Sequence, residues 1–371
     1  MSEETIDRSA RVSTLELFFD LVFVFTITQL TGVLVEGGSA GSALQVAVML
    51  AVIWWMYDGY AWLTNAIATD LLRFRLLLLG GMGAFLVIAL AIPGAYRSTG
   101  LAFGLGYAVV VLVHAGMYVR GTSMSEVAAI LRIVPFNLTA AAMVMAGGVA
   151  GGRVQDVLWA VAALLLWFTP WLTSTEGFVI AAEHFCERHG LVIIIALGES
   201  IVVIGVAAAG IPVDARLVLV ALVALALTAS LWWLYFREEE AVEQAMVEAD
   251  RSRRARLALV GFGYWHYGLL LGVVAVAAGL KKAIGSPYDE LGGWIGIELA
   301  VGVALFLWCT VGFSRTLGLG TSVPRLAAGA AALVTIPVGT EWTALAQLVV
   351  LVGIVAAALV AEDRRVLVQQ S

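Results

Sequence analysis

The chain has 371 residues, of which 61% are hydrophobic and 13% are charged. Soluble domains carry about 25% charged residues, so this chain lacks the polar side chains to cover itself, and most of its surface must face lipid. Two cysteines exclude a disulfide framework, and nothing in the sequence points to nucleic acid as a partner. The composition predicts an all-α integral membrane protein whose main partner is the lipid bilayer.

Twelve apolar runs follow one another along the chain. A helix that crosses a bilayer needs about 20 predominantly apolar residues, and these runs do not show the polar face of a helix in a soluble protein. We therefore predict about 12 transmembrane helices, of which the seventh is long and the eleventh short. The predicted spans are 14–35, 42–64, 74–95, 99–119, 127–149, 155–174, 182–209, 214–236, 256–280, 291–312, 323–338 and 342–361.

The basic residues predict how these spans are oriented. If the N-terminus is cytoplasmic, about three quarters of the 21 Lys and Arg residues fall on the cytoplasmic side, as the positive-inside rule requires. Both termini are therefore predicted to be cytoplasmic. The largest polar stretch, Arg237 to Arg256, is predicted to be a solvated connector, or a segment on the inner leaflet where its Arg cluster meets anionic lipid.

The two halves of the chain share weak matches in the same order. Trp54-Trp-Met-Tyr57 in the second span corresponds to Trp232-Trp-Leu-Tyr235 in the eighth. We predict two parallel six-helix repeats, residues 1–175 and 176–371, because an even number of spans returns the chain to the same side of the membrane. Sites in such proteins tend to lie between the halves, so spans one and seven are expected to face each other.

The first span contains the polar residues Glu16, Asp20 and Gln29. A carboxylate inside the membrane costs roughly 2.5–3.5 kcal/mol on insertion scales, so Asp20 should face protein or water. Glu16 lies one turn earlier on the same helix face. Because two close carboxylates oppose each other's ionisation, the pair suits the binding of a proton or a cation.

Both acids also have a structural interpretation. The segment from Ser13 to Glu16 fits a capping box at the start of a helix. Asp20 can instead form an ion pair with a basic residue of another segment. The candidates for that ion pair are Arg73, Arg75 and Arg132.

The seventh span repeats this arrangement with different residues. Glu199 and Ser200 lie well inside it, and alignment of the repeats places Gln29 opposite Glu199. A protonated Glu199 can donate a hydrogen bond to the amide oxygen of Gln29. Glu199 is therefore interpreted either as a proton or ion site or as part of an interhelical hydrogen bond worth about 0.6–2 kcal/mol.

The run Glu183-His-Phe-Cys-Glu-Arg-His189 gathers several possible metal ligands at the start of span seven. Its spacing matches no standard zinc pattern, so neither a metal nor another cofactor is predicted. Glu187, Arg188 and His189 are instead predicted to anchor or gate the span at the cytoplasmic interface.

Two further polar residues at membrane depth are secondary candidates. Asp58 lies in the inner half of span two, and Asn137 follows Pro135, whose ring frees a backbone carbonyl. Each is interpreted first as structural. Glycines such as Gly80-Gly-Met-Gly83 are expected to allow close packing of helices.

The chain resembles the bacterial low temperature requirement protein A (LtrA) family at two motifs. These are Thr14-Leu-Glu-Leu-Phe-Phe-Asp-Leu-Val-Phe-Val24 and Glu187-Arg-His-Gly-Leu-Val-Ile-Ile-Ile-Ala-Leu-Gly-Glu-Ser200. The resemblance implies a polytopic protein of the bacterial plasma (inner) membrane. The name of the family records an association with growth in the cold, so the resemblance leaves substrate and mechanism open.

The sequence carries no enzyme signature, such as a phosphate-binding Gly-rich loop or His-Glu-x-x-His, so no enzymatic activity is predicted. The leading hypothesis is a secondary transporter or a pathway for a proton, cation or small solute. Asp20 and Glu199 would bind the ion, and Glu16 and Gln29 would assist. The alternative is a non-transporting scaffold, or a sensor of stress or membrane state linked to growth at low temperature.

Overall fold

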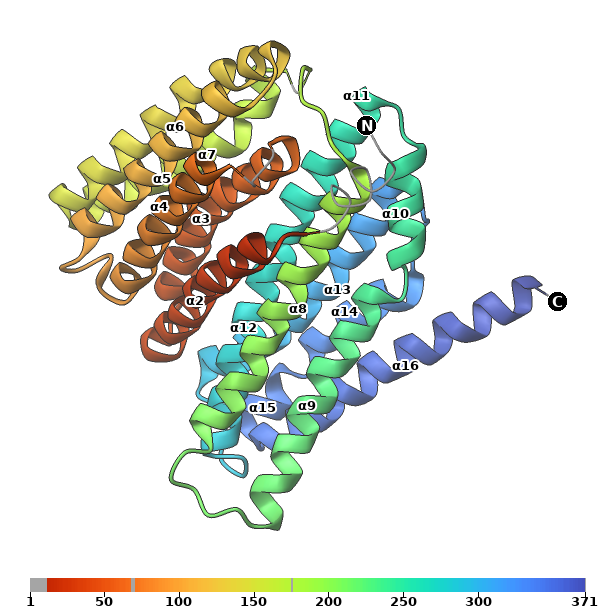
Figure 1. The fold of residues 1–371 in the computed structure, drawn as a ribbon. Helices are drawn as coiled ribbons and strands as arrows, with labels where there is room; N and C mark the ends of the chain where they lie inside the picture. Colours follow the sequence, from red (N-terminus) through yellow and green to blue (C-terminus); the bar gives the residue numbers. More distant parts are fainter. Residues whose placement is uncertain (1–11, 68–70, 175, 371) are drawn as a thin grey trace. The chain divides into compact units, whose positions relative to one another are not determined.

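The structure is a computed structural model that describes residues 12–67, 71–174 and 176–370, with side chains as far as residue 364. The described residues form helices and their connections, with no strand among them. Among the described residues, twelve helical segments are long and apolar enough to cross a membrane. Figure 1 shows the helices that form them. The predicted all-α membrane fold with about 12 spans is therefore confirmed.

The described chain divides into two compact units that interleave in sequence. Unit 1 is built from the described parts of Met1–Val33, Leu44–Val192 and Glu243–Leu259. Unit 2 is built from those of Leu34–Ala43, Ile193–Val242 and Val260–Ser371. Compactness does not test internal repetition, so the two repeats 1–175 and 176–371 stay a prediction.

Unit 1 contains the first six spans and the beginning of the seventh. Within it, α4 packs against α5, α5 against α6 and α6 against α7. A capping box formed by Ser123 and Glu126 starts α6, and Gly151, with φ 66°, separates α6 from α7. The elements are most of α2 (Thr14–Gly37) and of α3 (Ala40–Ala66), α4 (Leu72–Ala91), η1 (Ile92–Gly94), α5 (Gly100–Gly121), α6 (Met124–Ala150), α7 (Gly152–Leu172), the start of α8 (Ala182–Ala207), the end of α10 (Glu239–Glu248), α11 (Arg251–Leu257) and the start of η2 (Ala258–Trp265).

Aromatic side chains fill the interface between α2 and α3. The ring of Phe19 stacks on those of Tyr57 and Tyr60, with centroids 5.7 and 5.2 Å apart. The ring centroid of Phe23 lies 4.0 Å from that of Tyr57 and 5.8 Å from that of Trp54. Because these rings are buried, they hold one face of α2, the face that carries Asp20, against α3.

The polar stretch from Arg237 to Arg256 is largely helical, as α10 and α11, and Asp250 caps α11. The guanidinium of Arg254 donates to the carbonyls of Met246 and Ile180, at 2.8 and 3.1 Å. Arg251 donates to the carbonyl of Phe178 at 3.2 Å. These two arginines of the predicted lipid-facing cluster therefore bind backbone carbonyls within unit 1.

Unit 2 contains the remaining spans. Within it, α12 packs against α13, α13 against α14, and α16 against both α9 and α14. The short eleventh span is a broken helix, because Pro337 at the start of α15 has no N–H to continue the hydrogen bonding of α14. The elements are the end of α2, the start of α3, the rest of α8, α9 (Ala215–Phe236), the start of α10, the rest of η2 (Ala258–Trp265), α12 (His266–Gly285), α13 (Gly293–Leu317), α14 (Val323–Val334), α15 (Ile336–Glu341) and α16 (Ala344–Gln370).

A network of charges joins the ends of three helices in unit 2. The buried Arg325, in the first turn of α14, pairs with Glu362 at 2.7 Å and with Glu238 at 2.9 Å. Arg237, after α9, pairs with Glu362 and Asp363, each at 2.8 Å. The network fixes the ends of α9 and α14 against α16.

Candidate functional site

A single buried arginine joins the two sequence motifs. Nη1 of Arg188, on α8, lies 3.0 Å from Oε1 of Glu16, and its Nη2 lies 3.3 Å from Oδ1 of Asp20, both on α2. Nη1 also donates to the hydroxyl of Thr64 on α3. The exposed fractions of the three charged side chains are 1%, 2% and 0%. Arg188, for which the sequence predicts a role at the interface, is thus the ion-pair partner of Asp20.

Glu16 has a second role at the start of α2. Its Oε2 accepts hydrogen bonds from the backbone N–H of Ser13 at 2.9 Å and from the Ser13 hydroxyl at 2.8 Å. The Glu16 N–H donates back to the Ser13 hydroxyl at 3.3 Å. The predicted capping box is present, so one carboxylate both caps the helix and neutralises a guanidinium.

The hydrogen bonds around His184 fix its tautomer. The Asn65 carbonyl oxygen accepts from the N–H of Ala181 at 2.8 Å, which turns its NH₂ group towards Nδ1 of His184 at 3.1 Å. Nδ1 is therefore the acceptor, and Nε2–H donates to Oε2 of Glu16 at 3.3 Å. A neutral His184 satisfies both contacts of its ring.

Asp20 is only half satisfied. Its Oδ1 accepts from the hydroxyl of Tyr57 at 2.5 Å and from Arg188. Its Oδ2 is buried and has no hydrogen-bond partner among the described residues. An unsatisfied oxygen at this depth marks a position that a proton, a cation or a water molecule can fill.

The charge balance of this cluster is uneven. With His184 neutral, two carboxylates face one guanidinium, which leaves one negative charge in excess in a buried place. A buried charge without a counter-charge costs several kcal/mol. One additional positive charge, from a proton or a monovalent cation, brings the cluster to neutrality. The geometry therefore suits reversible binding of a single positive charge at Asp20.

A second buried pair adjoins the cluster in sequence. Nε2 of His189 lies 3.1 Å from Oδ1 of Asp58, and Nδ1 lies 2.9 Å from the carbonyl of Phe185. The imidazole of His189 therefore joins the Phe185 carbonyl to the Asp58 carboxylate by hydrogen bonds.

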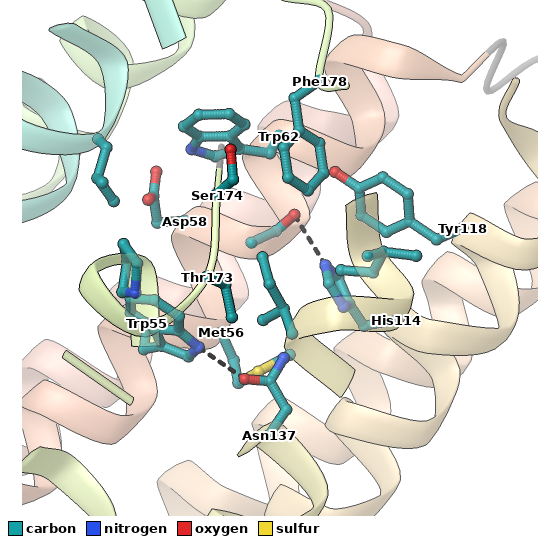
Figure 2. Close-up of a pocket in the computed structure, with 15 residues that line it drawn as sticks. Trp55, Met56, Asp58, Trp62, His114, Tyr118, Asn137, Thr173, Ser174 and Phe178 are labelled. Carbon is teal, nitrogen blue, oxygen red and sulfur yellow. Dashed lines mark hydrogen bonds between the residues drawn. The ribbon is translucent and has the colours of Figure 1, made fainter. Parts of the chain in front are cut away.

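Asp58 also lines a cavity of about 70 Å³ within unit 1. Figure 2 shows Asn137 and His114 on its wall, together with several aromatic side chains. The indole N–H of Trp55 donates to Oδ1 of Asn137 at 3.0 Å, and Nε2–H of His114 donates to the carbonyl of Gly59 at 3.0 Å. The secondary candidates Asp58 and Asn137 thus belong to one cavity.

The other predicted residues lie outside this cluster. Glu187 is exposed and accepts a hydrogen bond from the N–H of Val12 at 3.0 Å, which ties the chain before α2 to α8. Gln29 is half-buried on α2 in unit 1, whereas Glu199 and Ser200 are buried on α8 in unit 2. A meeting of Gln29 with Glu199 therefore stays a prediction.

Sequence reasoning did not assign Tyr57, Thr64 and His184 to the site. Tyr57 closes the aromatic motif that the two halves share, and His184 belongs to the run of possible ligands, so both carried a signal. Thr64 carried none. Among the residues that the structure describes, no group of three or more His, Cys, Asp or Glu side chains could hold a metal ion.

These features define a polytopic α-helical membrane protein with a buried charge cluster. The chain belongs to the family described as Bacterial low temperature requirement A protein (LtrA), which matches residues 11–361. It is also similar to the "Uncharacterized protein RA0937" of Rhizobium meliloti (strain 1021). The two are 28% identical over 336 residues, which cover 85% of this chain and 80% of that protein.

Proposed function

We propose that the protein is a secondary transporter or ion pathway of the bacterial plasma membrane, with both termini cytoplasmic and no enzymatic activity. The cluster of Glu16, Asp20 and Arg188 binds and releases a proton or a monovalent cation. The observation that carries this proposal is the unsatisfied Oδ2 of Asp20 in a buried cluster with one excess negative charge. Ionisable residues inside a membrane commonly mark such pathways.

Binding of the positive charge changes the partner of Arg188. When Asp20 is ionised, the guanidinium is shared between Asp20 and Glu16. When Asp20 is neutralised, the attraction between Asp20 and Arg188 falls, and Arg188 pairs with Glu16 alone. Because Arg188 lies on α8 and Asp20 on α2, this exchange weakens one link between two helices. Occupancy of the ion site is thereby coupled to helix movement.

The neighbouring pair of Asp58 and His189 supports a route for protons. Tyr57 precedes Asp58, and Arg188 precedes His189, so each helix presents consecutive residues to the two sites. The hydrogen-bonded pair of Asp58 and His189 gives the route a second pair of ionisable groups, beside the cavity that Asp58 lines.

The test is flux through the purified full-length protein in liposomes, recorded for protons, potassium and sodium. We expect Asp20→Asn to reduce the flux of the transported ion at least about tenfold, because the Coulomb attraction of the site is lost. The matched control is Glu126→Gln, which removes a buried carboxylate from a capping box on α6 and should leave the flux unchanged. Equal flux through the wild-type protein and Asp20→Asn would refute the role of Asp20.

Glu199 in unit 2 is proposed as a further ion site, and Ser200 beside it has a buried hydroxyl without a hydrogen-bond partner among the described residues. Glu199→Gln is measured in the same liposomes. A reduced flux supports a site in each half of the chain. An unchanged flux excludes Glu199 from the pathway. The role of the Asp20 cluster is tested separately, by the flux through Asp20→Asn.

A second candidate function is that of a non-transporting scaffold or sensor of membrane state. The engagement of Glu16 and Asp20 by one arginine favours it, since ion pairs of this kind can also be purely structural. In that case liposomes with the wild-type protein show no flux above empty liposomes for any of the three ions. Asp20→Asn then alters only thermal stability.

A further inference from the structure

The cavity beside Asp58 has aromatic walls. Trp55 and Trp62 come from α3, Tyr118 from α5, and Phe178 from the segment that follows α7. The rings of Trp62 and Phe178 meet edge to face at 5.4 Å, and those of Tyr118 and Phe178 at 6.0 Å. Figure 2 shows these side chains around the cavity together with the carboxylate of Asp58. Aromatic faces with a nearby carboxylate attract cations.

Some polar groups in the cavity wall can accept hydrogen bonds. His114 donates from Nε2 to the carbonyl of Gly59, so its Nδ1 has a lone pair, and Nδ1 is buried without a partner among the described residues. The Thr173 hydroxyl donates its proton to the carbonyl of Thr169 at 2.9 Å, so its oxygen is left as an acceptor. With the carboxylate of Asp58, these groups call for a ligand that donates hydrogen bonds. The cavity wall also has donors, namely the NH₂ group of Asn137 and the hydroxyls of Tyr118 and Ser174.

We infer that this cavity binds a small primary amine in its protonated form, an alkylammonium ion. The –NH₃⁺ group pairs with the carboxylate of Asp58, and the alkyl chain lies against the aromatic rings. This inference rests on the proposed function, for which it names the class of substrate. A cavity of about 70 Å³ has room for roughly five water-sized groups, which corresponds to butylammonium. A quaternary ammonium ion has the charge but lacks the N–H donors.

The location of the cavity suits a substrate site. The Oδ1 atom of Asp58, which lines the cavity, contacts His189, the residue next to Arg188 in the charge cluster. An alkylammonium ion at Asp58 therefore binds the same carboxylate as His189. Occupancy of the cavity is in this way transmitted to α8, which carries both His189 and Arg188.

The experiment measures binding of n-butylammonium to the full-length protein in lipid nanodiscs by titration calorimetry. n-Butanol, which has the same chain without the charge, and tetramethylammonium, which has the charge without N–H donors, are the comparison probes. We expect saturable binding of butylammonium, with n-butanol and tetramethylammonium each at least about tenfold weaker. Equal binding of butylammonium and n-butanol would show a merely apolar cavity and overturn the inference, as would no binding of butylammonium.

Two matched pairs of variants assign the binding to this cavity. Asp58→Asn should weaken butylammonium at least about tenfold, whereas Glu126→Gln, a buried acid outside the cavity, should not. Trp62→Leu should weaken it about fivefold or more, whereas Trp167→Leu, whose indole N–H binds the carbonyl of Ala51 at 3.2 Å, should not. If Asp58→Asn does not fold, the comparison of Trp62→Leu with Trp167→Leu tests the inference by itself. Unchanged affinity in Trp62→Leu overturns the inference.

Binding at equilibrium is independent of flux, so the two proposals can fail separately. Butylammonium binding in a protein that moves no ion or amine across liposomes keeps the cavity as a ligand site and refutes transport. Proton or cation flux without butylammonium binding keeps the proposed function and refutes the alkylammonium substrate.

Discussion

At the scale of single residues, Arg188 holds two carboxylates of α2 out of water. The cation also lies over the rings of Phe19 and Tyr57, at 5.6 and 5.8 Å from their centroids. Removal of one partner from a buried ion pair leaves an uncompensated charge, which is more damaging than removal of all the charges together. Arg188 is therefore a residue whose loss can be compensated by changes at its partners.

We predict that Arg188→Met lowers the stability of the protein by about 3–5 kcal/mol. Addition of Glu16→Gln and Asp20→Asn to Arg188→Met should restore part of that loss, because Gln still serves a capping box and no buried charge remains. Thermal unfolding in detergent compares these variants. Arg153→Met, at an exposed position at the start of α7, is the control and should stay within about 0.5 kcal/mol of the wild type. A triple variant no more stable than Arg188→Met contradicts this account.

At the scale of helices, α5 and α6 approach each other through glycine. A Cβ atom at Gly148 would lie 2.2 Å from the carbonyl oxygen of Gly100, and one at Gly104 would lie 2.6 Å from Cα of Met145. Small residues allow this contact inside a membrane, where packing replaces the hydrophobic effect. The expectation for Gly80-Gly-Met-Gly83 holds only in part. A Cβ atom at Gly81 would lie 2.8 Å from the Tyr60 hydroxyl, but nothing lies within 4 Å of a Cβ atom at Gly80 or Gly83.

This difference gives a paired prediction. Gly148→Ala should destabilise the protein by about 1–3 kcal/mol, because the new methyl group meets backbone atoms that cannot rotate away. Gly80→Ala should be neutral or stabilising by up to about 1 kcal/mol, because alanine favours the helix and the site is open. Melting temperatures of the purified variants decide the matter. Equal effects at both positions would mean that α5 and α6 are not in close contact at Gly148.

At the scale of the whole molecule, the number of spans and the basic residues together predict cytoplasmic termini. Single cysteines at exposed loop positions test this topology in intact cells, after Cys186 and Cys309 have been replaced by serine. Glu290→Cys, between α12 and α13, should react with a membrane-impermeant maleimide. Thr321→Cys, between α13 and α14, should react only after permeabilisation. The reverse pattern would invert the orientation.

The sequence by itself determined the features that depend on local order along the chain. The length of each apolar run predicted the twelve spans, because the thickness of the bilayer sets the length of a crossing helix. The capping box at Glu16 was also readable, since Ser13 and Glu16 are three residues apart and meet wherever the helix starts.

Only the tertiary structure decided the partners of the buried charges. Asp20 meets Arg188 across 168 residues of sequence, and Asp58 meets His189 across 131. Helical periodicity states which side chains share a face of one helix, but it does not state which other helix that face contacts. The packing of α2 and α3 against the start of α8 determines these partners. It brings Glu16 and Asp20 of the first span together in one buried cluster around Arg188.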